Sequence, residues 1–390
     1  MLISIVMPVY NNERYFPLAV KSIIEQEYKD FELIIIDDGS TDRTAIIADE
    51  IAATDSRIRV IHQSNQWVYA SFNRGIEAAK GEYIYIVNSD DRLRPGCLGL
   101  MAQKAKIYKP DIIWTKVLIH RCDANQCITA YDIAKGNGKV KEDFFCPNKK
   151  AVRDNWPYFF ASYLAQNQAN LYRSKVMKKH KFRNDVYGAD TLFNISIASD
   201  IESALVMKEP VYDHLIYSEL EMNVSAGKFY PYEHDMFNQI YQGYKTIFTR
   251  WELPAENYQH VLVKKRMKQV TREIHSLFYE NCKMTTEEKL YYILHTIPDK
   301  TVVNCAKSEN CEEELESRIL SGIRELFCRE YIEENSEMYF VYELLDSLLR
   351  YEKDENDYKK IESAIWNLKN PAHIGKCFYE KLACTRGRKE

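Results

Sequence analysis

Two adjacent carboxylates follow an apolar segment at residues 81–91, Gly-Glu-Tyr-Ile-Tyr-Ile-Val-Asn-Ser-Asp-Asp. The segment is patterned as a β-strand, so we expect the side chains of Asn88 and Asp90 to share one face of a sheet. Hard oxygen ligands of this kind suit Mg²⁺ or Mn²⁺, ions that bridge protein carboxylates to substrate phosphates. The segment therefore predicts a metal site that handles a diphosphate. A polar turn is the alternative, because Asn, Ser and Asp are common turn residues.

A second carboxylate pair, Asp37 and Asp38, ends the apolar segment Phe-Glu-Leu-Ile-Ile-Ile. Ser40-Thr41 after it is expected to cap a helix that includes residues 45–52. A third β-patterned segment, residues 2–10, ends in Asn-Asn-Glu before the next helical pattern. Strands that alternate with helices favour a mainly parallel sheet, and ligands bind beyond the carboxyl ends of its strands. We therefore expect three strand ends to place polar groups on one edge.

These segments resemble the N-terminal half of family 2 glycosyltransferases, which have the GT-A fold. The matching segments are Pro8-Val9-Tyr10-Asn11, Ile36-Asp37-Asp38-Gly39-Ser40-Thr41-Asp42 and Gly81 through Asp91. The likeness covers residues 1–120 well and continues more weakly to about residue 225. It implies an enzyme that transfers a sugar, with inversion, from a nucleotide diphosphate, usually UDP, to a hydroxyl acceptor.

The resemblance also assigns roles to residues. Tyr10 is placed against the base, and Asp38 matches the carboxylate that accepts the uracil N3–H. Asp90 matches the metal-binding Asp of the D-x-D motif, whose first Asp is replaced here by Asn88, a residue that brings no negative charge. The nucleotide-binding set is Pro8, Tyr10, Asn12, Glu13, Asp37, Asp38, Arg74, Asn88 and Ser89. The metal set, for Mn²⁺ or Mg²⁺, is Asp90, Asp91 and His214.

Two members of these sets have ordinary structural alternatives. Arg74 belongs to a predicted helix, residues 67–79, and a lone Arg on a helix is commonly a solvated surface residue. His214 belongs to a segment that resembles a family strand with a diphosphate or metal contact. A partly buried His bonded to a neighbour fits the same segment.

The segment Tyr187-Gly-Ala-Asp190 resembles the family's Glu-Asp motif, in which the Asp is the catalytic base. Ala189 stands in place of the Glu. An inverting transfer needs a group that removes the proton of the acceptor hydroxyl, and an ionised carboxylate within reach does this. Asp190 is predicted to be this base. It is also placed as an N-cap, because an apolar helical pattern follows it.

Composition disfavours several other classes of protein. The 390 residues exceed a typical single domain, and a net charge of −4 with a pI near 6.2 gives no reason to expect a nucleic-acid partner. The ten cysteines lack the C-x-x-C spacing of zinc sites, so we expect reduced thiols in a cytoplasm. The sequence starts in a strand without a signal segment and has no apolar run of membrane-spanning length. A lipid-linked acceptor would require peripheral binding at the inner face of a membrane.

We expect two domains. Residues 1–225 are predicted to form the GT-A catalytic domain, an α/β unit with a mixed, mainly parallel sheet flanked by helices. Residues 226–390 show helical spacing with few β-patterned runs and are predicted to form an all-α domain. Its role is open between acceptor binding, homo-oligomer formation and peripheral membrane contact.

The leading hypothesis is a metal-dependent hexosyl- or N-acetylhexosaminyltransferase of surface polysaccharide synthesis. Its donor is a UDP-sugar and its acceptor a glycan or lipid-linked hydroxyl. A sugar-nucleotide-binding protein with impaired catalysis is the alternative, because Asn88 and Ala189 replace acidic residues of the motifs. A nucleotidyltransferase or dinucleotide enzyme is the third class, although no G-x-G-x-x-G follows the first strand.

Overall fold

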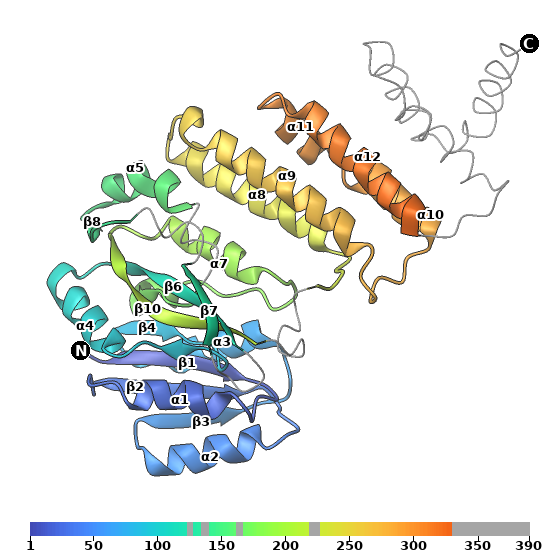
Figure 1. Ribbon diagram of the computed structural model, residues 1–390. Helices are drawn as coiled ribbons and strands as arrows, with labels where there is room; N and C mark the ends of the chain where they lie inside the picture. The colour runs from blue at the N-terminus through green and yellow to red at the C-terminus, as the bar shows by residue number, and fades with distance from the viewer. Residues whose placement is uncertain (123–127, 134–139, 161–166, 218–226, 330–390) are drawn as a thin grey trace, which may run out of the picture. The chain divides into compact units, whose positions relative to one another are not determined.

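The structure is a computed structural model that describes residues 1–122, 128–133, 140–160, 167–217 and 227–329 (Figure 1). The chain divides into two compact units. The first comprises Met1–Val224 and Gln239–Tyr258, and the second Ser225–Asn238 and Gln259–Glu390. Helix α8 (Glu233–Arg250) therefore begins in the second unit and ends in the first. The single domain boundary expected near residue 225 stays a prediction.

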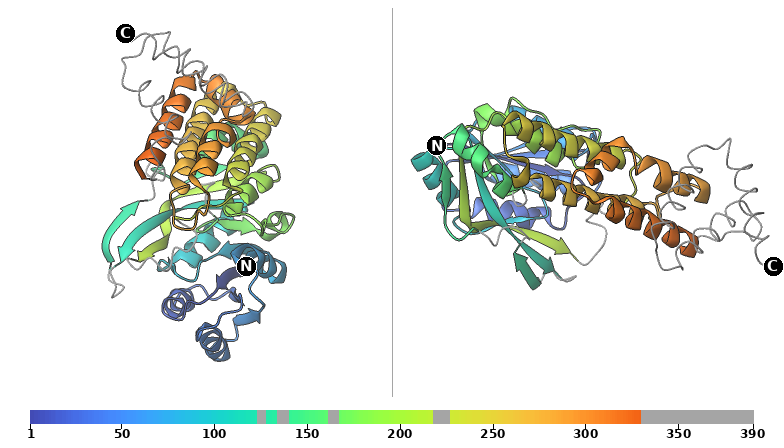
Figure 2. Two further views of the ribbon diagram at one scale, coloured as in Figure 1. Left: turned by 90° about the vertical axis from the view of Figure 1, so that its right-hand side faces the viewer. Right: turned by 90° about the horizontal axis from the view of Figure 1, so that it is seen from above.

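The first unit is built on a mixed sheet (Figures 1 and 2). Within the described ranges its strand order is β3-β2-β1-β4-β9-β6-β10-β5, with β7 beside β6 and β8 beside β10. The strands are β1 (Ile3–Val9), β2 (Phe31–Asp37), β3 (Ile58–His62), β4 (Tyr83–Ile86), β5 (Arg92–Leu93), β6 (Ile112–Cys122), β7 (Ile128–Ile133), β8 (Phe144–Cys146), β9 (Leu171–Arg173) and β10 (Ala204–Tyr217).

Strands β3, β2, β1 and β4 are parallel, as the alternation of strands and helices predicts. The sheet beyond them differs from the mainly parallel expectation. Strand β9 enters antiparallel to both of its neighbours, β4 and β6, and the β6–β7 hairpin adds another antiparallel pair. Among the described strands of this half, only β6 and β10 are parallel. The difference arises because short antiparallel strands enter by hairpins and loops, which leave no helix-alternation pattern in the sequence.

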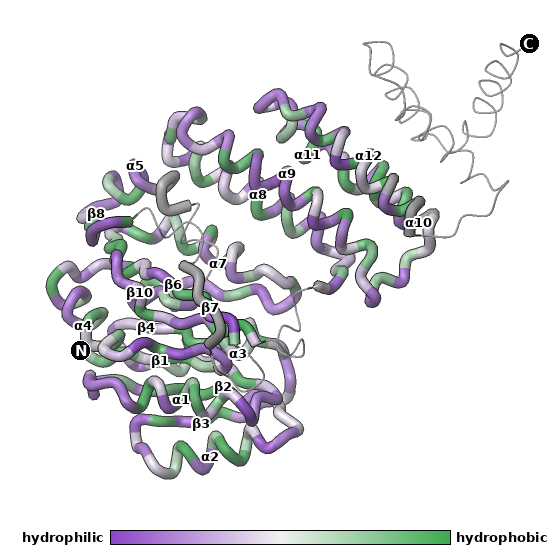
Figure 3. Tube along the Cα trace, in the orientation of Figure 1, coloured by the Kyte–Doolittle hydropathy of each residue, from purple (hydrophilic) through white to green (hydrophobic). Residues whose placement is uncertain are grey.

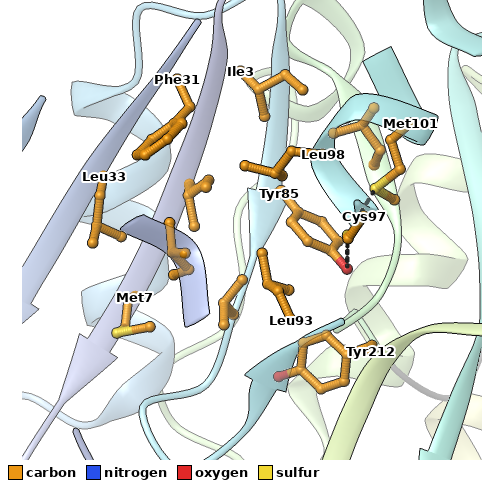
Figure 4. Packing of buried hydrophobic residues seen from close by; sticks show 14 of the residues in the cluster. Ile3, Met7, Phe31, Leu33, Tyr85, Leu93, Cys97, Leu98, Met101 and Tyr212 are labelled. Carbon is orange, nitrogen blue, oxygen red and sulfur yellow. Dashed lines mark hydrogen bonds between the residues drawn. The ribbon is translucent and has the colours of Figure 1, made fainter. Parts of the chain in front are cut away.

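Helices cover both faces of the parallel strands. The helices of this unit are α1 (Phe16–Ile24), α2 (Thr44–Thr54), α3 (Val68–Ala78), α4 (Cys97–Tyr108), α5 (Lys149–Phe160), α6 (Ser174–Met177) and α7 (Ala189–Ala198). Alternate residues of β1, β2 and β4 pack with α1 and α4 in one apolar cluster, in which Tyr85 lies beside Cys97 and Leu98 (Figure 4). On the other face α3 approaches β1 so closely that a Cβ at Gly75 would lie 2.3 Å from Val6 Cγ1.

Helix α2 begins later than the sequence predicts. Ser40 and Thr41 do not cap it; the helix starts at Thr44, whose N–H donates to Asp42 Oδ1 over 2.9 Å. Ser40 and Thr41 instead bond to Asn11 in the neighbouring loop. The capping prediction is wrong because the loop after β2 turns toward the loop after β1 before the helix begins.

The second unit is helical in its described part. It contains the start of α8, then α9 (Gln259–Ser276), α10 (Thr286–Tyr291), a π-helical turn (Tyr292–Thr296), α11 (Lys300–Lys307) and α12 (Glu312–Arg329). Hydrophobic and hydrophilic residues alternate along α9, as an amphipathic helix requires (Figure 3). Thr285 and Glu288 form a capping box at the start of α10. Residues 330–390 of the predicted all-α domain lie outside the described residues.

A buried ionic network joins three helices of this unit. Arg266 and Glu273 on α9 are fully buried, with Arg266 Nη1 2.7 Å from Glu273 Oε1. His234 lies with Nδ1 2.7 Å from Glu273 Oε2 and Nε2 3.2 Å from Asp299 Oδ2. Asn238 accepts from Arg266 and donates to Asp299, the residue that caps α11. The packing of this unit thus depends on paired charges as well as on apolar contacts.

None of the helices in the described part of the chain combines the length and the apolar composition needed to cross a bilayer.

Candidate active site

The carboxyl ends of β1, β2 and β4 meet at one edge of the sheet. The register pairs Val9 with Asp37 across β1 and β2, and Val6 with Ile86 across β1 and β4. The backbone N–H of Asp38 then donates to the carbonyl of Val9 over 2.9 Å. Polar residues follow each of these strand ends, so the expected gathering of polar groups on one edge is confirmed.

Reciprocal hydrogen bonds tie the loop after β1 to the loop after β2. The backbone N–H of Asn11 donates to Ser40 Oγ over 3.0 Å, and Asn11 Oδ1 accepts from the N–H of Thr41 over 2.7 Å. Glu13 Oε2 accepts from the N–H of Arg43 over 3.0 Å. The Glu13 carboxylate is predicted to contact the nucleotide. In the structure, at least one of its oxygens bonds the two loops to each other.

Asn12 joins the same loops to the loop after β4. It is buried, its N–H donates to Thr44 Oγ1 over 2.8 Å, and its Oδ1 accepts from the N–H of Tyr15. Its side-chain Nδ2 donates to both the carbonyl and the hydroxyl oxygen of Ser89, each over 3.0 Å. Both side-chain atoms of Asn12 are thus engaged within the protein. The structure places Asn12 and Ser89 together, as a scaffold for the edge.

Asp37 and Asp38 have different surroundings at the end of β2. Asp37 accepts from the N–H of Ser40 and lies 2.9 Å from Nδ1 of His62. This bond raises the pKa of His62 above its usual value; burial opposes the rise and Asp49 adds to it. Asp38 is bonded through Oδ1 alone, and Oδ2 accepts no hydrogen bond from another described residue.

Two other predicted nucleotide contacts are open to solvent. Tyr10, directly after β1, is 48% exposed, so its ring is free to stack on a base. Arg74 is exposed on α3, which fits the surface alternative as well as a phosphate contact. Pro8, by contrast, is buried inside β1.

Residues 88–91 form a turn, and the strand alternation expected there is wrong. Strand β4 ends at Ile86, and the N–H of Asp91 donates to the carbonyl of Asn88 over 3.3 Å. Asn88 Nδ2 donates to Asp91 Oδ2 over 3.1 Å. Asn88 is therefore directed at Asp91 and does not share a face with Asp90 in the way a strand would impose.

Asp91 is fully buried and its carboxylate is surrounded by donors. Oδ2 accepts from the Tyr212 hydroxyl over 2.7 Å as well as from Asn88. Oδ1 lies 2.9 Å from His214 Nδ1 and accepts from the N–H of Leu215 over 3.0 Å. A carboxylate with four partners and no exposed surface has no oxygen to offer a cation. The structure thus speaks against Asp91 as a metal ligand and gives it the role of an anchor for β10.

Asp90 and His214 remain available. The Asp90 carboxylate is half-buried and accepts no hydrogen bond from another described residue, and the His214 side chain is 37% exposed. Burial and the charge of Asp91 raise the pKa of Asp90, while His214 opposes that rise. Burial alone would lower the pKa of His214, but its bond to Asp91 raises it above the usual value.

No three His, Cys, Asp or Glu side chains among the described residues are arranged to hold a metal ion by themselves. Divalent ions in nucleotide sites use one or two protein ligands and complete their shell with substrate phosphates and water. Asp90 and His214 fit such a site: one is an unpaired carboxylate, and the other is an imidazole whose Nδ1 is held by a carboxylate.

Asp190 lies in the first turn of α7 and is not its N-cap. The helix begins at Ala189 and the N-cap is Gly188, whose φ of 85° is in the left-handed region that favours glycine. Asp190 Oδ1 accepts from the N–H of Thr191 over 2.8 Å. The Tyr69 hydroxyl accepts from the N–H of Gly188 over 3.2 Å, and burial together with the Asp190 charge raises the pKa of Tyr69.

The structure adds residues that the sequence argument did not single out. Tyr212 bonds to the turn after β4. Because Tyr212 stands two residues before His214 on β10, strand periodicity could have placed the two side chains on one face. Gln63 donates to Asp38, and Tyr69 accepts from Gly188 close to Asp190. Neither Gln63 nor Tyr69 belongs to a sequence motif.

In open α/β sheets ligands bind beyond the carboxyl ends of the parallel strands, which is the edge at which these carboxylates gather. Residues 4–172 match the family described as Glycosyl transferase family 2. The likeness to glycosyltransferase family 2 that the motifs predict is thus confirmed over residues 4–172. The solved structure of S. aureus TarS 1–349 with UDP-GlcNAc has a similar fold, with a TM-score of 0.57 and 16% sequence identity, over 86% of this chain and 95% of that one. The predicted GT-A fold is confirmed.

Several curated proteins are similar to parts of the chain. Glycosyltransferase GlyG of Streptococcus pneumoniae is 41% identical over 113 residues, 29% of this chain and 38% of that protein. The uncharacterized glycosyltransferase EpsJ of Bacillus subtilis is 27% identical over 65% of this chain and 71% of its own length. A Campylobacter jejuni protein named GalNAc(5)-diNAcBac-PP-undecaprenol beta-1,3-glucosyltransferase is 27% identical over 46% and 62%, respectively.

Proposed function

We propose that this protein is an inverting glycosyltransferase that moves a sugar from a UDP-sugar to a hydroxyl of a glycan or lipid-linked acceptor. The observation that carries the proposal is the sheet edge at which Asp38 and Asp90 both keep carboxylate oxygens without a partner in another described residue. The undecaprenol-linked glycan in the Campylobacter relative's name and the UDP-GlcNAc bound to TarS support the acceptor and donor classes.

The nucleotide is assigned to the ends of β1 and β2. The exposed ring of Tyr10 stacks on the base, and Asp38 Oδ2 accepts the imide N–H of uracil. Cytosine has a lone pair at the same ring position, so it would be repelled. The hydrogen-bonded loops around Asn11 and Glu13 fix the positions of these base contacts before the donor binds.

The metal site is assigned to Asp90 and His214. Asp91 accepts from Nδ1–H of His214, which leaves the lone pair of Nε2 for a cation. A Mn²⁺ or Mg²⁺ ion held there would supply charge neutralisation at the departing diphosphate. Asp91 is the positioning residue, and Asn88 and Tyr212 keep its other oxygen occupied.

Asp190 is assigned as the base. Its carboxylate takes the proton of the acceptor hydroxyl as that oxygen bonds to the anomeric carbon and the bond to the diphosphate breaks. The buried ring of Tyr69 beside it excludes water from one side. A lipid-linked acceptor would place this reaction at the cytoplasmic face of a membrane, in the synthesis of a surface polysaccharide. The helical unit is a candidate for acceptor, membrane or homo-oligomer contact.

A second function, sugar-nucleotide binding with impaired catalysis, is favoured by one observation. Ala189 replaces the motif Glu, so this position brings no carboxylate to the neighbouring Asp190. A donor-hydrolysis assay with Mn²⁺ across several UDP-sugars separates the two. Turnover of any donor supports the enzyme, and tight donor binding without turnover supports the binding protein.

We expect Asp38→Ala to weaken UDP binding by about 1.5–3 kcal/mol, because it removes a charged acceptor for the base. Calorimetry with UDP and CDP measures this. The wild type should prefer UDP, and the variant should lose the preference. Asp30→Ala, at the exposed start of the same strand, is the matched control and should bind as the wild type does. Equal affinity of the wild type for UDP and CDP would rule out the Asp38 assignment.

Asp90→Ala should abolish the part of UDP affinity that depends on Mn²⁺, since it removes the carboxylate assigned to the metal beside His214. Calorimetry with Mn²⁺ and with EDTA measures that part. Asp185→Ala is the control, because that exposed carboxylate is paired with Arg183 at 2.7 Å. If EDTA leaves UDP affinity of the wild type unchanged, the metal assignment fails.

A further inference from the structure

The loop between β3 and α3 holds the Asp38 carboxylate by one oxygen only. Gln63 Nε2 donates to Asp38 Oδ1 over 2.7 Å, and the backbone N–H of Gln66 donates to the same oxygen over 2.9 Å. Asp38 is 4% exposed, and its Oδ2 accepts no bond from another described residue. A buried carboxylate fixed in this way presents a single oxygen in a single direction.

Gln63 is itself held from three sides. Its Nε2 also donates to Ser71 Oγ, over 3.0 Å, and Ser71 is fully buried on α3. Its backbone N–H donates to the carbonyl of Asp37 over 3.0 Å. The two amide hydrogens are therefore both used, and a flipped amide would set its oxygen against a carboxylate. Gln63 bridges the end of β2 to α3 in one orientation.

The backbone of this loop is strained where it leaves Asp38. Trp67 has φ 76° and ψ 157°, a region that residues other than glycine rarely occupy. It directly follows Gln66, and its carbonyl accepts from the N–H groups of Ala70 and Ser71 to start α3. Strain of this kind persists where the surrounding structure fixes it. Here Trp67 is fixed between the bond of Gln66 to Asp38 and the start of α3.

We propose that Gln63 is a positioning residue that sets the base specificity of the nucleotide site. By holding Oδ1, Gln63 leaves Asp38 Oδ2 as an acceptor for the imide N–H of a uracil-type ring. The same oxygen would repel the N3 lone pair of cytosine. The inference rests on the proposed assignment of the donor nucleotide to Asp38. It adds a residue that determines which nucleotide is accepted.

The test is Gln63→Met, which keeps the length of the side chain and removes its donors. Calorimetry with UDP and CDP should give a UDP affinity about tenfold lower and a UDP-to-CDP ratio reduced by the same factor, as expected for one hydrogen bond to a charged group. Gln66→Met is the matched control. Gln66 reaches Asp38 through its backbone, so this variant should keep the wild-type ratio.

Ser71→Ala provides a second variant, because it removes the other acceptor of the Gln63 amide and leaves Gln63 in place. The UDP-to-CDP ratio should fall in the same direction, while the melting temperature shows that the variant is folded. If Asp38→Ala loses the preference for UDP but Gln63→Met and Ser71→Ala retain it, the inference is overturned and the proposed function stands. A wild type that does not distinguish UDP from CDP would overturn both.

Discussion

Asp190→Asn should lower turnover by about 10²–10⁴-fold, because the amide cannot take the proton of the acceptor hydroxyl. UDP affinity and melting temperature should stay close to the wild-type values. Asn keeps an oxygen that accepts from the N–H of Thr191, and the change lies in the first turn of α7. Steady-state transfer to the acceptor, calorimetry with UDP and a thermal melt measure the three quantities.

Asp185→Asn is the matched control for Asp190→Asn. Asp185 is exposed, its carboxylate is paired with Arg183, and this pairing lowers the pKa of Asp185. Its replacement should leave turnover unchanged. If Asp190→Asn transfers sugar at the wild-type rate, Asp190 is not the base. A loss of turnover in Asp185→Asn would then identify Asp185 as the base.

Arg266→Leu should lower the free energy of unfolding by about 3–5 kcal/mol, because it breaks a buried ion pair and leaves Glu273 Oε1 without its guanidinium partner. Both side chains are fully buried in the second unit. Urea unfolding followed by circular dichroism measures the change. Lys21→Met is the control: Lys21 and Glu25 form an exposed pair, whose loss should cost under about 1 kcal/mol.

The double variant Arg266→Leu/Glu273→Leu separates charge from packing. Removing both charges should recover much of the stability lost in Arg266→Leu, since no unpaired ion remains between them. If the double variant loses as much stability as Arg266→Leu and Glu273→Leu lose together when each is measured alone, the pair acts through packing. The buried-charge argument for Arg266 would then be wrong.

The parallel half of the sheet could be predicted because each strand carries its own signal. Apolar runs of β-branched residues ending in Asn, Asp or Gly define β1, β2 and β4, and the register places their ends together. The positions of Tyr10, Asp38 and Asp90 follow from those ends. Local patterns suffice there because a parallel strand and its helix are neighbours in sequence.

The detail of the edge could not be predicted, because it depends on residues far away in the chain. Strand periodicity predicts that Asn88→Asp would add a carboxylate beside Asp90. In the structure the Asn88 amide donates to Asp91, so an Asp there would face another carboxylate. Three of the four partners of Asp91 lie on β10, more than 120 residues away. Gln63 has no local motif either; only the folded loop brings it to Asp38.

The tie between the loops after β1 and β2 has a thermodynamic consequence. Loops that order only on binding reduce affinity by the conformational entropy they lose, about 0.5–1.5 kcal/mol for each immobilised side chain. Asn11, Glu13, Ser40 and Thr41 are already fixed by hydrogen bonds to each other's loops. Donor capture at this edge should therefore proceed with little entropic loss from these segments, leaving the base contacts to determine the affinity.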